Sequence, residues 1–175
     1  SGGKAVNLKE KSIDTIEWKD FKMSDLGFKN YHGKRIKKSD RINGKTTFLT
    51  AGKENQGVVG TVGNDVEIWN NPITVDMFGN AFYHNYDCAG DDNVYAFVNE
   101  NLNEYIKKYI ATIIMMQSKS KYSYENQFRQ TNADNLTVKL PVNNLGNPDF
   151  QYMELYIKNI ENKAENIIKN LNSNI

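Results

Sequence analysis

Two stretches of this 175-residue sequence concentrate side chains of the kinds that proteins commonly use to contact nucleic acids. Residues 33–38 (Gly-Lys-Arg-Ile-Lys-Lys) form a compact basic run, and residues 119–129 interleave lysines, tyrosines, amides and an arginine. Lysine and hydroxyl groups suit phosphates, whereas Arg, Asn and Gln can make paired contacts to purine edges in the major groove. Such loops are also common as plain solvated surface, and the pattern alone leaves that alternative open. The candidate DNA contacts are Lys34, Arg35, Lys37, Lys53, Tyr83, Lys119, Lys121, Tyr122, Gln127 and Arg129.

The charges are segregated along the chain, although the net charge is only +1. Residues 4–53 hold thirteen Lys and Arg against six acids, and residues 54–105 hold nine acids with no Lys or Arg. Residues 106–141 are basic again, with a net charge of +4. A fold that joins the first and third of these segments would have a basic face, which attracts a phosphate backbone at long range. Because nineteen of the cations are Lys and three are Arg, simple solvation of the surface explains the charge equally well.

The sequence contains no recognisable catalytic or metal-binding arrangement. The glycines of residues 57–63 lack the spacing of a dinucleotide loop and are more typical of a hairpin or bulge. Residues 70–73 (Asn-Asn-Pro-Ile) only approach the Asn-Pro-Pro-aromatic motif of amino-methyltransferases. The single cysteine, Cys88, excludes an intramolecular disulfide and a CxxC zinc site, and His32 and His84 have no paired ligand. We therefore expect no catalytic residue, no metal and no cofactor.

Length and composition predict one globular domain. Hydrophobic residues make up 39% and charged residues 25% of the chain, which is enough to bury a core at this length. The sequence has no run of eighteen apolar residues and no charged-then-apolar leader, so we expect a soluble, cytoplasmic protein without a membrane span. The opening Ser1–Gly3 is typical of a scar left by tag cleavage.

The elements that would position the two loops are short strands and one internal helix. Runs of β-prone residues recur between residues 15 and 140, separated by Gly, Asn and Asp. Residues 101–104 (Asn-Leu-Asn-Glu) predict a capping box that begins the helix. The predicted strands are 46–50, 58–62, 66–69, 73–75, 81–83, 94–98 and 136–140, and the predicted buried helical face is Leu102, Ile106, Tyr109, Ile110, Ile113 and Met116. The expected class is mixed α/β (α+β), a small β-rich domain followed by a long C-terminal helix.

A second helix is predicted over residues 148–171, with Asn147 as its cap and Pro148 at its first position. Its apolar residues follow one another at alternating spacings of three and four, which is a heptad seam. Two interpretations are open: the helix lies on its own domain, or it forms a coiled coil with a second helix. We favour the coiled coil, and so an assembly role. The seam residues are Phe150, Met153, Ile157, Ile160, Ala164, Ile167 and Leu171.

The order of segments resembles one half of a bacterial restriction–modification specificity (S) subunit, the DNA-reading subunit of type I systems and of BcgI-like type II systems. The resemblance spans most of residues 17–158, and the junction into the heptad helix is its most specific part. Residues 73–94 look closest to the BcgI-like branch. The segments that carry the resemblance are 17–26 with 33–40, 47–50 with 55–57, 73–80 with 91–94, and 139–142 with 146–154 and 156–158.

The resemblance implies a target-recognition domain at 4–145 and a coiled-coil helix at 146–175. Such a domain reads one half-site of double-stranded DNA, while methylation and cleavage belong to a methyltransferase subunit and a restriction subunit. The helix would pair with a second copy or a second recognition domain. Base-contacting residues vary with the target in this family, so none is carried over. The alternatives are a coiled-coil scaffold that binds only protein and a free-standing nuclease or methyltransferase.

Overall fold

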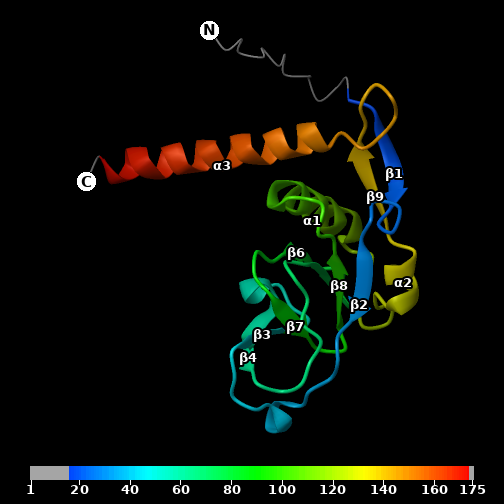
Figure 1. The fold of residues 1–175 in the computed structure, drawn as a ribbon, viewed down its shortest axis with the longest axis vertical. Coiled ribbons are helices and arrows are strands. Elements are labelled where there is room, and N and C mark those ends of the chain that lie inside the picture. Colours follow the sequence, from blue (N-terminus) through cyan, green and yellow to red (C-terminus); the bar gives the residue numbers. More distant parts are fainter. Residues whose placement is uncertain (1–15, 174–175) are drawn as a thin grey trace.

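Residues 16–173, which the computed structural model describes, fold into three small sheets, two helices that pack on them and one projecting helix (Figure 1). The predicted tag scar at residues 1–3 lies outside the described residues. The strands are β1 Trp18–Lys22, β2 Lys29–His32, β3 Thr46–Leu49, β4 Val58–Val62, β5 Ile73–Asp76, β6 Ala81–Tyr83, β7 Cys88–Gly90, β8 Val94–Val98 and β9 Thr137–Pro141. The helices are α1 Glu104–Ser118, α2 Gln130–Asp134 and α3 Phe150–Asn172, with short 3-10 turns η2 Lys38–Asp40 and η3 Glu54–Gly57.

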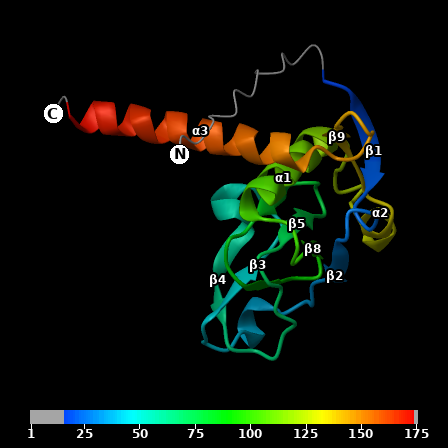
Figure 2. The ribbon, with the colours of Figure 1, turned by 45° about the horizontal axis from the view of Figure 1, so that its top comes forward.

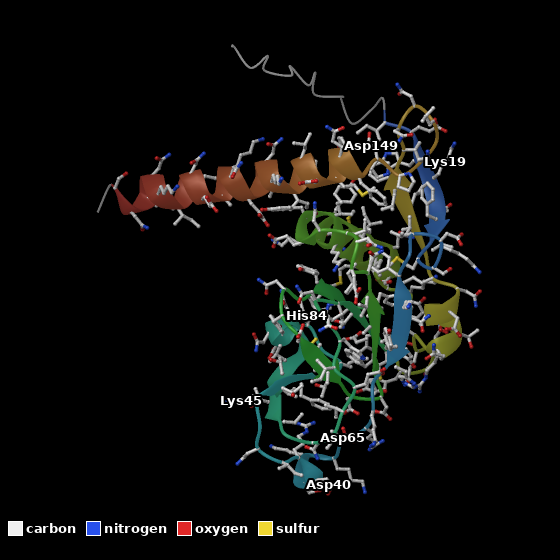
Figure 3. The ribbon with its side chains drawn as sticks, in the orientation of Figure 1. Lys19, Asp40, Lys45, Asp65, His84 and Asp149 are labelled. Carbon is white, nitrogen blue, oxygen red and sulfur yellow. The ribbon has the colours of Figure 1, made fainter. Side chains whose placement is uncertain are left out.

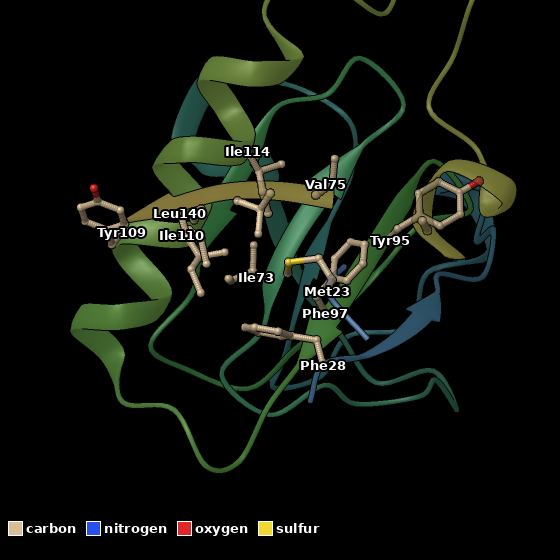
Figure 4. Close-up of a cluster of buried hydrophobic side chains, with 14 of the residues drawn as sticks. Met23, Phe28, Ile73, Val75, Tyr95, Phe97, Tyr109, Ile110, Ile114 and Leu140 are labelled. Atoms are coloured by element: carbon tan, nitrogen blue, oxygen red, sulfur yellow. The ribbon is translucent and has the colours of Figure 1, made fainter. Parts of the chain in front are cut away.

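The central sheet has the strand order β2-β8-β5-β6, and all its neighbouring strands are antiparallel. A second sheet has the order β4-β3-β7, with β3 and β7 parallel, and β1 pairs with β9 in a two-stranded ribbon. Helix α1 packs against β5, β6 and β9. The main core lies between these elements and includes Ile73, Phe97, Ile110 and Leu140 (Figure 4). The predicted mixed α+β class with a long C-terminal helix is therefore confirmed.

The strand predictions are right for six of the seven apolar runs, and four elements depart from the predictions. The run 66–69 is not a strand, since only Trp69 forms an isolated bridge, to Cys88. Strands β1 and β2 were not predicted because each is rich in charged and polar residues. They become strands by pairing with β9 and β8, which lie far away in the sequence. Strand β7 was missed because its residues, Cys-Ala-Gly, include no β-branched or aromatic side chain.

The capping residue of helix α1 lies two residues after the predicted cap, Asn101. The Asn103 side chain accepts a hydrogen bond from the Ile106 amide at 3.1 Å, so Asn103 is the cap. Asn101 lies in the preceding turn, where its amide donates to the Asn99 side chain at 2.8 Å. The buried face runs through Ile106, Ile110 and Ile114, whereas the predicted core residue Met116 is 67% exposed. The buried face of α1 therefore includes Ile114 in place of the predicted Met116.

Helix α3 is capped by Asp149, whose carboxylate accepts from the Tyr152 amide at 3.0 Å. The predicted cap Asn147 instead accepts, through its carbonyl, a bond from the Asn143 amide, and Pro148 bridges to Val142. These two residues belong to the turn before the helix, which explains the later start. The helix then leaves the domain as a straight rod (Figures 1 and 2). Within residues 16–173, none of the helices has both the length and the apolar composition needed to cross a bilayer.

Candidate nucleic-acid interface

The loops that carry most of the candidate cations meet at one end of the central sheet. The C-terminal ends of β2 and β5 lie beside the N-terminal end of β8, because both strands run antiparallel to β8. The loops 33–37, 77–80 and 91–93 therefore emerge together. Parallel pairing of β3 with β7 brings loop 50–53 to the same end, and the Asp91 amide donates to the Leu49 carbonyl at 2.9 Å. Strand topology thus gathers loops that are distant in the sequence.

Asp76, at the end of β5, joins two of these loops through its buried carboxylate. Its Oδ2 accepts from the Gly52 amide at 2.8 Å and from Asn80 Nδ2 at 2.7 Å. Its Oδ1 accepts from the amides of Phe78 and Asn80, each at 2.9 Å. Four donors to one carboxylate hold the 50–53 loop, and with it Lys53, against the 77–80 turn.

The 119–129 segment packs against the same turn. The Phe128 amide donates to the Met77 carbonyl at 2.8 Å, and the fully buried Phe128 ring meets Tyr122 edge-on at 5.4 Å. Tyr124 meets Phe78 edge-on at 5.0 Å and is 77% exposed. An exposed aromatic ring held by a second ring presents a face on which bases or sugars can pack. Tyr124 was not nominated, although it lies inside the stretch that the sequence singles out.

The basic loop at 33–38 is anchored by backbone hydrogen bonds at its start and by the packing of Ile36. The amides of Gly33 and Lys34 donate to the carbonyls of Val94 and Gly90 at 3.0 and 2.9 Å. Position 33 needs glycine because a Cβ there would lie 2.0 Å from the Asp91 carbonyl oxygen. Ile36 then packs in a small cluster with Phe48, Val62 and Ala89. The side chains of Lys34, Arg35 and Lys37, which flank Ile36, are exposed.

Of the ten nominated DNA contacts, nine lie on the converging loops or at their borders. Seven cations among them are exposed, while Tyr122 and Gln127 are half-buried. Tyr83 lies apart. It pairs with Ile73 at the opposite end of the central sheet, and Lys107 Nζ lies 5.9 Å from its ring centroid. Burial also raises the pKa of the Tyr83 hydroxyl. The nine are Lys34, Arg35, Lys37, Lys53, Lys119, Lys121, Tyr122, Gln127 and Arg129.

The exposed cations of this end are not neutralised by carboxylates. Ion pairs in the described part of the chain involve only Lys19, Lys108 and Lys158 as cations. Acidic residues also lie at this end: Asp65 and Glu67 line one pocket with Lys34, and Asp91 and Asp92 lie in the 91–93 loop, but none of them is within ion-pair distance of these cations. Burial raises the pKa of Asp91 and its side-chain hydrogen bond with Asp92 adds to the shift, while the Asp92 amide and the charge of Arg41 oppose it. A cation without an internal partner keeps its full attraction for an external phosphate.

Burial holds His84 and Cys88 in their neutral forms. His84 hydrogen-bonds with Thr74 and Tyr86 inside the domain (Figure 3), and burial lowers its pKa to about 4. Burial raises the pKa of the Cys88 thiol to about 12, so this thiol is protonated at neutral pH. Among residues 16–173, His, Cys, Asp and Glu side chains nowhere form a group of three that could hold a metal ion.

The predicted heptad seam divides into two halves. Met153 is fully buried in the main core, and Phe150 and Ile157 pack against the same core. Lys108 of α1 donates to Glu161 at 2.6 Å, and the Tyr109 ring meets Tyr156 edge-on at 5.7 Å. Beyond Glu161 the helix is exposed. The exposed seam residues are Ile160, Ala164, Ile167 and Leu171, with Ile168 beside them.

Comparison with known proteins places these features in a family. Residues 15–173 match the family model described as "Type I restriction modification DNA specificity domain". The "Type II restriction enzyme BgcI specificity subunit S.BcgI" of Heyndrickxia coagulans is 29% identical over 160 residues, covering 88% of this chain and 46% of that protein. The chain therefore spans less than half the length of this relative.

Two solved structures share the fold. The S subunit of a type I restriction-modification system from M. genitalium superposes with a TM-score of 0.62 at 14% identity, covering 93% of this chain and 43% of that one. The HsdS subunit from Thermoanaerobacter tengcongensis superposes with a TM-score of 0.57 at 11% identity, covering 87% and 39%. At these identities the likeness establishes the fold.

Proposed function

The chain belongs to the type I restriction modification DNA specificity domain family, and from this premise we propose that it reads one half-site of a double-stranded DNA target. In this proposal it acts in the cytoplasm as a specificity subunit, or as half of one. It directs a partner methyltransferase subunit, and a restriction subunit where one is present. The chain itself performs no chemistry, and it requires no cofactor.

The observation that carries the proposal is the convergence of the loops at one end of the central sheet. Five loops meet there, and their exposed cations have no carboxylate partner among the described residues. Lysines can neutralise phosphates, whereas Arg129 and Tyr124 are exposed and can contact base edges or sugars. Gln127 is less available, because its Oε1 is buried and its Nε2 donates to the Tyr124 carbonyl at 3.1 Å. Phosphate contacts fix the register on the duplex, and base contacts supply the specificity.

We divide the chain into a recognition unit at 4–145 and an assembly helix at 146–175. The exposed half of the α3 seam presents Ile160, Ala164, Ile167 and Leu171 on one face. In a partner-bound state this stripe would be covered by a second helix, from another copy of the chain or from a second recognition domain. Such a pairing would place two half-sites at a fixed spacing.

The test is selection from a random duplex pool, with the chain alone and with the methyltransferase encoded beside its gene. We expect one enriched motif. Two inverted halves at a fixed spacing would support a homodimer through α3. If no motif emerges even with the partner present, the coiled-coil scaffold becomes the better explanation. Methyl transfer or magnesium-dependent cleavage by the purified chain alone would contradict the non-catalytic role.

A charge-matched control separates the proposed interface from general basicity. Replacing Lys34 and Lys37 with Ala should abolish enrichment. Replacing Lys163 and Lys169, which lie on the exposed part of α3, should leave the motif unchanged when the chain is tested alone. Equal losses in both variants would mean that binding follows net charge and not the converging loops.

A further inference from the structure

Arg41 lies beyond the basic loop at a backbone position that is held from both sides. The Asn64 side chain accepts from the Ile42 amide at 2.9 Å and donates to the Asp40 carbonyl at 3.0 Å. The Gly63 amide also donates to the Ile42 carbonyl at 2.7 Å. The residues on either side of Arg41 are therefore fixed to the loop after β4. Its neighbour Asp40 lies at the end of the molecule remote from α3 (Figure 3).

The Arg41 side chain is partly buried and lies over an aromatic ring. Its guanidinium carbon lies 5.1 Å from the centroid of the Phe48 ring, and Phe48 is fully buried. Its Nε is buried and has no hydrogen-bond partner. No ion pair within residues 16–173 includes Arg41. The ring thus orients the planar group. The Asp91 carboxylate is near enough to interact electrostatically with Arg41, but no described carboxylate lies within ion-pair distance of its terminal nitrogens.

This arrangement differs from that of the surrounding cations. Between residues 34 and 45 the chain carries four lysines and two arginines against one acid, Asp40. The lysines are flexible and exposed, as phosphate contacts commonly are. An arginine stacked on an aromatic ring loses little further freedom on binding, and its fork matches two acceptors in one plane. A buried Nε without a partner costs stability, which argues that the orientation itself is useful.

We propose that Arg41 reads a guanine in the target, with its terminal N–H groups donating to O6 and N7 in the major groove. Guanine is the base that presents two acceptors at this spacing. Lysines of the 34–45 segment contact the flanking phosphates. The inference rests on the proposed function and adds to it a specificity-determining residue outside the two stretches that the sequence singles out.

The experiment is the same random-duplex selection, with Arg41→Ala, Arg41→Lys and Lys45→Ala beside the wild type. Both Arg41 variants should lose the preference for guanine at one position, by roughly 5- to 150-fold, and keep the rest of the motif. Arg41→Lys retains the charge but lacks the fork. Lys45→Ala, an exposed cation of the same segment, should weaken all sequences equally.

The outcomes separate the inference from the proposed function. A wild-type motif that both Arg41 variants keep at every position overturns the role of Arg41 and leaves the function standing. Uniform weakening by Arg41→Ala, with the base preferences unchanged, makes Arg41 a phosphate contact and also overturns it. A wild type without any motif removes the function and the inference together. If Arg41→Ala shows no cooperative unfolding transition, it is not folded, and the loss or retention of the guanine preference in Arg41→Lys then tests the inference.

Discussion

Replacing His84 should remove much of the acid sensitivity of this fold. The His84 side chain is fully buried, with Nε2 2.8 Å from Thr74 Oγ1 and Nδ1 3.0 Å from the Tyr86 hydroxyl. Burial lowers its pKa from 6.5 to about 4, because an imidazolium here would lose its hydration. Its two partners are hydroxyl groups, which cannot compensate a positive charge as a carboxylate would.

The sign follows from where the proton binds. Below about pH 6.5 the unfolded chain binds a proton at His84 and the folded chain does not, so the free energy of unfolding falls as the pH falls. The loss ends near pH 4, where the folded state also becomes protonated. Between about pH 7.5 and pH 4.5 these two pKa values predict a loss of about 2.5 kcal/mol from this one group. That is a large fraction of the ~5–15 kcal/mol by which domains are stable.

Urea unfolding at the two pH values measures this loss, followed by the fluorescence of the buried Trp69. His84→Gln should lose about 2.5 kcal/mol less on acidification than the wild type. The difference between the two pH values cancels any constant cost of the substitution. His32→Gln, at the exposed histidine, is the matched control and should retain the wild-type loss. If His84→Gln remains as acid-sensitive as the wild type, other groups cause the effect and the argument from burial is wrong.

Three further predictions test the interface and the helix anchor. Lys37→Ala should lower the affinity for all duplexes and reduce the slope of log K against log salt concentration by about one, because one phosphate contact is lost. An unchanged slope would exclude Lys37 from the DNA-contacting surface. Arg129→Ala should weaken the preferred site by about 1–3 kcal/mol more than random duplex in a binding titration, and equal weakening would make Arg129 a phosphate contact. Met153→Ala, at a fully buried residue of α3, should lower the free energy of unfolding by about 2–5 kcal/mol in urea titrations of the chain alone. Leu171→Ala is its control at a 62% exposed position of the same seam and should change that free energy by less than about 0.5 kcal/mol.

Local patterns in the sequence predict the strands that carry apolar runs. Strands β4, β5, β6 and β8 follow from β-branched and aromatic runs between turn residues. Strands β1 and β2 could not be predicted in this way, because they are rich in charged and polar residues and become strands only by pairing with β9 and β8. For these strands the tertiary pairing, and not the local preference, decides the structure.

The candidate interface shows the same division. Residue type alone nominated nine side chains that the fold brings to one end, since basic and amide-rich loops are exposed wherever they lie. It also nominated Tyr83, which the direction of β6 places at the other end. Asp76 and the ring pair of Phe78 with Tyr124 were missed, because their importance depends on contacts between loops. No short-range spacing in the sequence signals such contacts.

The first half of the C-terminal seam packs on its own domain, whereas for the exposed second half the coiled coil stays a prediction. Met153 and its neighbours are anchored in the core, and Lys108 reaches Glu161 at 2.6 Å, three turns beyond the cap. The direction of α3 is therefore fixed by α1, which also packs on the strands that carry the loops. Beyond Glu161 the seam is exposed. A partner bound there would be held at a set orientation to the converging loops, because the same rigid helix pair connects both surfaces. The packing of α1 against α3 would thus couple the proposed recognition to the proposed assembly.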